Sequence, residues 1–163
     1  MAQVISTEEM FFTAFEPKTA NRFIMYMDGV PAYLIKSVTR PNLNIDVQTL
    51  EHINIKRKLR AGKAEWQDIT LTLYDPVVPS AAQTAMEWIR LSHESVTGRN
   101  GYADFYKKDL VINVLGPVGD LVEEWTIKGA FCNAVDFGTL DWGTGDALEV
   151  GLTVSYDYAI LQF

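Results

Sequence analysis

Residues 148–158, LEVGLTVSYDY, alternate apolar and polar side chains over their whole length. Because successive side chains of a β-strand point to opposite faces, this spacing predicts a strand with one face in a core and the other in water. The apolar side comprises Leu148, Val150, Leu152, Val154, Tyr156 and Tyr158. The polar side comprises Glu149, Gly151, Thr153, Ser155 and Asp157. A half-buried strand of this kind is typical of an antiparallel sheet.

Working outward, other stretches predict further strands. Ile69, Leu71 and Leu73 alternate with polar residues, and the strand ends at Asp75-Pro76. Residues 110–115 and 125–131, joined by a Gly/Pro-rich turn, are expected to form a hairpin. Residues 22–27 and 33–38 are expected to form another around Gly29.

One helix is predicted, over residues 80–97. Ser80 and Gln83 have the spacing of a capping box, apolar residues follow at helical spacing as far as Val96, and Gly98 is the expected stop. Together the patterns predict a mainly β chain. Its expected architecture is an antiparallel β-sandwich or barrel with one flanking α-helix and a long protruding β-hairpin loop.

The chain has 163 residues, 48% of them hydrophobic, and its 14 Lys+Arg against 21 Asp+Glu give a net charge of −7. This indicates one folded domain, residues 1–163. The acidic excess argues against a protein that neutralises nucleic-acid phosphates over its surface. No window is long and apolar enough to cross a membrane, and no signal-peptide pattern begins the chain, so we expect a soluble protein made in a cytoplasm.

Two segments fit the core pattern poorly. Residues 1–21 form an arm whose Met and Phe side chains need a cover. Residues 42–65 alternate at first and then become strongly basic, which predicts a long exposed hairpin or loop whose apolar side meets another chain. The basic side chains are Lys56, Arg57, Lys58, Arg60 and Lys63.

Apart from these five charges, the chain holds nine Lys+Arg against 21 acids, a net of −12. A +5 projection and a −12 body favour head-to-tail association of copies. A localisation signal, a nucleic-acid patch and a merely solvated tip are the other interpretations of the run.

Catalytic chemistry finds little support. His52 and His93 are isolated, and Glu123 and Glu124 are adjacent on a strand and point apart. Cys132 is the one cysteine, so neither a disulfide nor a cysteine zinc site forms within the chain. The glycines near Gly143 lack the lysine of a phosphate loop. We expect no enzyme, no cofactor and no metal.

The order of several short motifs resembles the tail tube proteins of contractile-tailed bacteriophages, which are related in fold to the inner tubes of contractile injection machines. The resemblance is scattered over most of the chain. It rests on Asn21-Arg22-Phe23, residues 66–73 (WQDITLTL) before Asp75, the helix around Trp88, Ile127-Lys128-Gly129, Leu140-Asp141-Trp142, Glu149-Val150 with Leu152, and Tyr156-Asp157-Tyr158.

The resemblance implies a structural virion protein. Hexameric rings of a β-sandwich with one helix would stack into the hollow inner tail tube, through which DNA is ejected. Its implied partners are the sheath, the baseplate and the tail terminator, with the tape-measure protein and DNA passing through the lumen unbound. The implied location is the virion tail, after assembly in the bacterial host cytoplasm.

Two surfaces follow from combining the resemblance with the charge pattern. The family's long loop, matched by residues 42–65, reaches the neighbouring ring, so the five basic residues become candidate inter-ring contacts. The polar side of the last long strand becomes the candidate lumen face, with Glu149, Thr153, Ser155 and Asp157; the helix or sheath is its other possible neighbour. One alternative is a tube-like protein of a contractile injection system. Another is a non-enzymatic β-sandwich module that binds a polar ligand on a platform of Tyr102, Phe105 and Tyr106, and a third is a small baseplate or injected effector protein with the same fold.

Overall fold

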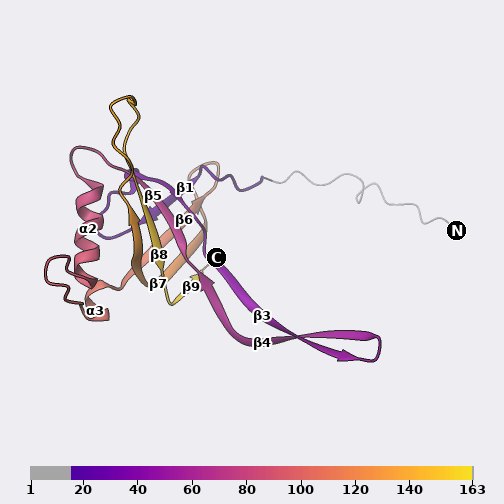
Figure 1. The fold of residues 1–163 in the computed structure, drawn as a ribbon. Coiled ribbons are helices and arrows are strands. Elements are labelled where there is room, and N and C mark those ends of the chain that lie inside the picture. The colour runs from indigo at the N-terminus through magenta and orange to yellow at the C-terminus, as the bar shows by residue number, and fades with distance from the viewer. Residues whose placement is uncertain (1–15, 163) are drawn as a thin grey trace.

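The computed structural model describes residues 16–162. In this range the chain forms one seven-stranded antiparallel sheet, a separate two-stranded sheet and one main helix (Figure 1). The large sheet has the order β1-β6-β7-β8-β5-β2, with β9 on β7. Its strands are β1 (Phe23–Tyr26), β2 (Ile35–Val38), β5 (Ile69–Tyr74), β6 (Lys108–Leu115), β7 (Leu121–Asp136), β8 (Glu149–Ser155) and β9 (Tyr158–Leu161).

Strand β7 is shared by both halves of the large sheet. Its first part pairs with β6 and β9, and its last part pairs with β8. Gly129, at the changeover, has φ of +67°, which favours glycine, and the Asp157 carboxylate occupies the place a Cβ would take. The sheet therefore bends back on itself like a sandwich but does not close into a barrel, which confirms the mainly β, antiparallel fold.

The core lies between the two halves of this bent sheet and under helix α2 (Ala81–Ser92). Its fully buried side chains include Leu71, Leu73, Ile112, Ile127 and Leu152. Each such side chain contributes about 1.5–3 kcal/mol through burial. Trp88 of α2 is buried on the sheet, and its Nε1 donates to the carbonyl of Tyr106 at 2.7 Å, which ties α2 to the short helix α3 (Ala103–Tyr106).

The N-terminal end of α2 is capped twice. Ser80 Oγ accepts from the Gln83 amide, as the sequence predicts. Asp75 Oδ1 also accepts from the Ala81 amide at 3.0 Å and the Ala82 amide at 3.3 Å, so it satisfies donors at the helix start. Asp75, which directly follows β5, therefore also caps the start of α2.

The other end of α2 differs from the expected residue 97. The helix ends at Ser92, whose Oγ donates to the Ile89 carbonyl, and His93 is already extended. Val96 is 93% exposed, so a further helical turn would gain no contact with the core. Gly98 closes a separate turn through its amide and the Glu94 carbonyl.

The predicted hairpin of residues 22–27 with 33–38 is wrong. Strand β1 pairs with β6, whereas β2 pairs with β5 at the other end of the sheet order. After Gly29, a single bridge joins Met27 to Val30, and a 3-10 turn, η1 (Ala32–Leu34), leads into β2. The pairing of β6 with β7 is confirmed.

Candidate assembly surfaces

The long exposed hairpin predicted for residues 42–65 is present as β3 (Asn42–His52) and β4 (Ile55–Gln67). Within the described residues, these strands pair only with each other, and they project from the body (Figure 1). Only Asp68 separates β4 from the core strand β5. At the base, Trp66 lies against Tyr156 with ring centroids 5.9 Å apart. Along the hairpin the side chains are almost all exposed.

A bulge divides the hairpin into two parts. The register shifts between Ile45 and Val47, where Asp46 lies opposite extra residues of β4. Gly62, with φ of +66°, lies in that bulge, and a Cβ there would approach the Asp46 carboxylate. Bulges bend and twist a strand pair locally, so the outer part of the hairpin is aimed independently of its base.

Beyond the bulge, the register separates basic from apolar side chains. Directly paired residues share a face. One face therefore carries Lys56, Lys58 and Arg60, paired with Glu51, Thr49 and Val47. The opposite face carries Leu50, Ile55 and Leu59 together with Arg57. Lys56 Nζ lies 3.2 Å from Glu51 Oε1, in keeping with this arrangement.

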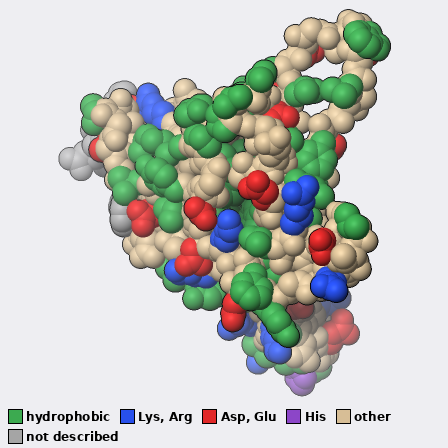
Figure 2. All heavy atoms as spheres, turned by 90° about the vertical axis from the view of Figure 1, so that its left-hand side faces the viewer, with side chains coloured by type: hydrophobic (Ala, Val, Ile, Leu, Met, Phe, Trp, Pro, Cys, Tyr) green, Lys and Arg blue, Asp and Glu red, His purple; other side chains and the backbone are tan. Residues whose placement is uncertain are grey.

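The basic residues lie along β4 and not at the tip of the hairpin. The turn is formed by Ile53 and Asn54, and Ile53 is 88% exposed, whereas the basic residues lie along β4 and Lys63 falls in the bulge. Asp46, Glu51 and Glu65 belong to the same hairpin. Five basic and three acidic side chains give the hairpin a net charge of +2, which leaves −9 for the rest of the chain. Figure 2 shows basic side chains along the projection at the bottom of the molecule.

The expected polar strand is β8. Val150, Leu152 and Val154 are buried, and Glu149, Thr153 and Ser155 lie on the opposite face. Thr153 is paired with Thr70 on one side and Ala134 on the other. This open face therefore consists mainly of small, uncharged side chains.

The charged groups around the open face are partly neutralised. Glu149 forms an ion pair with Lys36, and the hydrogen bond to Glu149 raises the pKa of Lys36 against the opposing effect of its burial. Ser155 Oγ donates to Asp68 Oδ1 at 2.8 Å.

Asp157 does not join the other three polar residues. It follows the end of β8, and its two oxygens accept from Lys107 Nζ at 2.8 and 2.9 Å. Its amide donates to the Lys128 carbonyl. The alternation in the sequence continues past Ser155, where β8 ends, so Asp157 is not part of the polar face of this strand.

The loop between β7 and β8 is a second projecting surface (Figures 1 and 2). Leu140 is 82% exposed, and Trp142 is fully exposed. The Asp136 and Asp141 carboxylates accept from the amides of Gly138 and Gly143 and fix two turns. In the sequence, apolar residues among turn-forming glycines are the sign of this exposed surface.

The three aromatic residues expected to form a platform, Tyr102, Phe105 and Tyr106, do not lie together. Tyr102 and Phe105 are exposed, with ring centroids 6.1 Å apart. Tyr106 instead packs edge-on against Phe131 at 5.6 Å. Two aromatic rings remain on the surface, beside the short helix α3.

The fold has counterparts among solved structures, although no family model and no curated protein matches the sequence. A chain from the anti-feeding prophage cap, its tube terminating cap, superposes with a TM-score of 0.73 at 19% identity, over 97% of this chain and 99% of that one. The chain has the fold of contractile injection system tube components.

Chains from two structures of an extracellular contractile injection system, PVC, have a similar fold. A chain of its sheath/tube terminator gives a TM-score of 0.72 at 20% identity, over 93% of this chain and 100% of that one. A chain of its sheath–tube complex gives 0.69 at 20% identity, over 98% and 99%. Each match covers nearly all of both chains.

The groups weighed for catalysis lie apart. His52 is on the exposed hairpin, and His93 Nδ1 is 2.9 Å from Asn100 Oδ1. Burial raises the pKa of the Cys132 thiol to about 11, which disfavours the reactive thiolate. Glu123 is buried and forms ion pairs with Lys18 and Arg40, whose side chains are exposed. Residues 16–162 contain no cluster of three His, Cys, Asp or Glu side chains suited to a metal, and no helix there could span a bilayer.

Proposed function

We propose that this chain is a structural subunit of the inner tube of a contractile phage tail. Hexameric rings of the chain stack into a hollow tube inside the sheath, between baseplate and tail terminator, and DNA is ejected through the lumen after the tape-measure protein. The tube is assembled in the host cytoplasm and becomes part of the virion. The protein acts by assembly and not by catalysis.

The β3–β4 hairpin is the observation that carries this proposal. A two-stranded hairpin is at best marginally stable by itself in water. This one also exposes Leu50, Leu59 and Ile55, each at 43% or more. Such apolar surface indicates a protein–protein contact, and a neighbouring copy both covers it and holds the hairpin in shape.

Charge gives the contact a direction. The net +2 hairpin meets a net −9 body, so a head-to-tail contact is attractive whereas two bodies or two hairpins repel each other. Contacts of this heterologous kind form rings when their rotation closes and filaments when it does not. Lys56, Arg57, Lys58, Arg60 and Lys63 are accordingly proposed as inter-ring contacts.

The open face of β8 and β5 suits a duct. Thr70, Thr153 and Ser155 are small and uncharged, and the Lys36 cation is held by Glu149. A wall without free Lys or Arg does not bind phosphates, which lets DNA slide through without a specific site. We propose Glu149, Thr153 and Ser155 as lumen-facing residues; Asp157, paired with Lys107, is left out.

A second candidate is the tube or cap of a contractile injection system. It is favoured by the solved structures, which belong to such systems and match the whole chain. The two candidates share the ring, the stacking and the open-face lumen, and differ in what passes through the tube. Particles isolated with the tube attached distinguish them, because only a phage tail ends in a DNA-filled head.

Negative-stain electron microscopy of the purified protein tests the proposal. We expect rings and tubes of uniform bore, with six-fold averages in end views. Dispersed single particles at every protein concentration and salt concentration would overturn it and favour the binding module. A tube structure with Thr153 and Ser155 pointing away from the channel would overturn the lumen assignment alone.

A further inference from the structure

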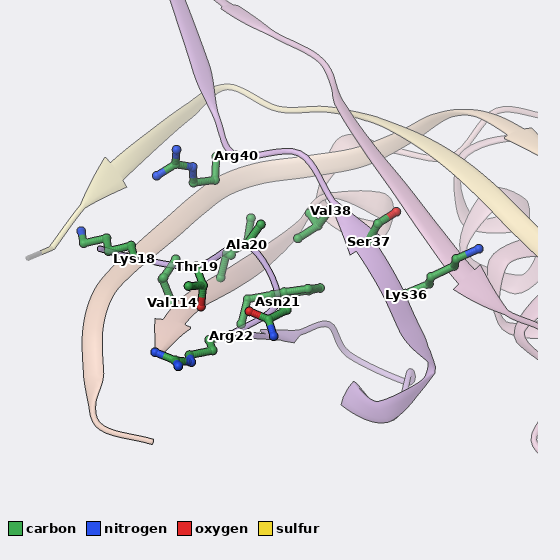
Figure 3. Close-up of a pocket in the computed structure, with 12 residues that line it drawn as sticks. Lys18, Thr19, Ala20, Asn21, Arg22, Lys36, Ser37, Val38, Arg40 and Val114 are labelled. Carbon is green, nitrogen blue, oxygen red and sulfur yellow. The ribbon is translucent and has the colours of Figure 1, made fainter. Parts of the chain in front are cut away.

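The large sheet leaves a groove between its two end strands. β1 and β2 each pair with a single neighbour in the described chain, β6 and β5 respectively. A groove of about 710 Å³ lies between them (Figure 3). Its apolar lining includes Phe23, Val38, Ile112 and Val114. That volume is in the range of about 300–1,000 Å³ that holds a small ligand or a few residues of peptide.

The rim of the groove is basic. Figure 3 shows Lys18, Arg22 and Arg40 around its opening, while Lys36 extends away from it. Lys18 and Arg40 share the buried Glu123 carboxylate, with Arg40 at 3.5 Å. Three cations against two carboxylates, the buried Glu123 and the exposed Glu16 beside Arg22, leave the rim with one net positive charge. Thr19 Oγ1, on a lining residue, is buried without a hydrogen-bond partner in the described part of the chain.

These properties define the ligand. Unpaired strand edges offer backbone donors and acceptors to an added strand, as in peptide recognition by β-augmentation. The apolar lining accepts large hydrophobic side chains, and the basic rim accepts carboxylates. The groove therefore fits an extended, acidic and aromatic peptide.

Residues 1–15 of this chain contain such a peptide. Their sequence includes Glu8-Glu9-Met10-Phe11-Phe12, two acids followed by three apolar residues. They lie outside the described residues, which begin at Glu16, and the Glu16 carboxylate is 3.5 Å from Arg22 on the rim. The chain thus leaves the described fold at the groove.

We propose that residues 8–12 dock in this groove of their own chain, with the carboxylates toward the basic rim and the apolar side chains on the lining. Met10 is six residues from Glu16, a reach of up to about 20 Å when extended. Residues 8–12 can therefore reach the groove from Glu16, which lies at its rim. A tethered segment also has a high effective concentration at its own groove, about millimolar for a short linker.

Docking there covers the two exposed sheet edges. An open edge is a site for unwanted pairing with other chains. The bound segment removes that hazard without any ring or tube being formed. The inference is therefore independent of the proposed function and can be tested on single molecules.

Disulfide formation in the full-length chain tests the docking. In a Cys132→Ser background, Met10→Cys is combined with Ser37→Cys, a near-isosteric change at a lining residue. The matched control combines Met10→Cys with Thr97→Cys, an exposed residue beyond α2. Oxidation is followed on non-reducing gels, at dilutions where sedimentation shows monomers. We expect an intramolecular disulfide to form at least about tenfold faster in the first pair, because docking raises the local thiol concentration.

Equal rates of disulfide formation in the two pairs would overturn the proposal. A product made mainly of disulfide-linked dimers would overturn it too, because the segment would then dock in the groove of a second copy. Glu8→Lys with Glu9→Lys is expected to slow the first pair, and an unchanged rate would refute the role of the basic rim. If a cysteine variant fails to fold, hydrogen exchange of the β1 and β2 amides in the wild-type chain and the Glu8→Lys/Glu9→Lys variant decides. We expect faster exchange in the variant, and identical exchange contradicts docking.

Discussion

The body and the β3–β4 hairpin are built from the same alternating pattern but use it differently. In β8 the apolar side chains are buried under α2 and the sheet, whereas in the outer hairpin Leu50 and Leu59 remain exposed. The body is stabilised by contacts within one chain. In the described residues the outer hairpin pairs only within itself, and the base contacts the body through Trp66 and Tyr156. Under the proposed function, a neighbouring copy covers the rest. Alternation therefore predicts a buried face without telling which chain buries it.

The largest effect is expected from reversing the hairpin charge. Replacing Lys56, Arg57, Lys58, Arg60 and Lys63 by Glu changes the hairpin from +2 to −8, which should abolish tube formation while the body stays folded. Microscopy and sedimentation measure assembly, and circular dichroism checks the fold. Arg90→Glu with Arg99→Glu, at exposed sites near α2, is the control. Tubes of normal length in the five-residue variant would show that these charges do not direct stacking.

A matched pair of leucine truncations separates the two regions. Leu152→Ala empties space in the core and should lower the free energy of unfolding by about 2–5 kcal/mol. Leu59→Ala on the hairpin should change monomer stability by less than about 0.5 kcal/mol and still weaken assembly. Denaturant unfolding measures the first effect and the critical concentration for tubes the second. Equal losses of stability would mean that the hairpin belongs to the folding unit of the body.

Within the body, the double cap of α2 gives a smaller effect. Asp75→Ala removes the acceptor for the Ala81 and Ala82 amides and should cost about 0.5–2 kcal/mol of stability. Ser80→Ala removes the acceptor for the Gln83 amide, at 3.4 Å, and the hydroxyl that donates to Asp75, at 3.3 Å. It should cost less, because Asp75 still accepts from the two helix amides. Thermal unfolding of the two variants measures the difference. A larger loss for Ser80→Ala would contradict Asp75 as the main cap.

The smallest effect concerns pH. Burial alone would raise the pKa of Glu123, but hydrogen bonds from Lys18 and Trp125 and the charges of Lys18 and Arg40 outweigh it and lower that pKa. A carboxyl with a lowered folded pKa stabilises the fold above its unfolded pKa, and this contribution disappears as the pH falls through the folded value.

The wild-type protein should therefore lose more of its unfolding free energy than Glu123→Gln between about pH 5 and pH 3. Denaturant titrations at several pH values measure the two slopes. Parallel slopes would exclude Glu123 as a source of acid sensitivity in the body.

Local patterns in the sequence predicted the elements well and their partners poorly. The buried face of β8, the cap at Ser80 and the long hairpin follow from spacing within a few residues. The pairing of β1 with β6 depends on residues far along the chain, and the turn after Met27 looks like a hairpin turn although it leads to the other end of the sheet.

The surfaces were predicted only in part, because they too depend on which distant residues pair with each other. Counting Lys56–Lys63 alone exaggerated the charge of the hairpin, because Asp46 and Glu51 come from the preceding strand and lie beside the basic residues only after pairing. Asp157 continues the alternation in the sequence. In the structure its carboxylate lies against Gly129 of β7 and accepts from Lys107. The groove between β1 and β2 has no sequence signal, since it exists only where two distant strands fail to meet.

The single residue between β4 and β5 has a mechanical consequence. A pull on the hairpin along its length passes through Asp68 directly into β5, which is paired on both sides, with β2 and β8. Such a load acts along the strand, so the ladder hydrogen bonds share it and must break together, whereas a load across the strand would open them one at a time. A chain held by its hairpin is thus anchored through a strand that is paired on both sides in its own sheet, an arrangement that resists tension along the hairpin.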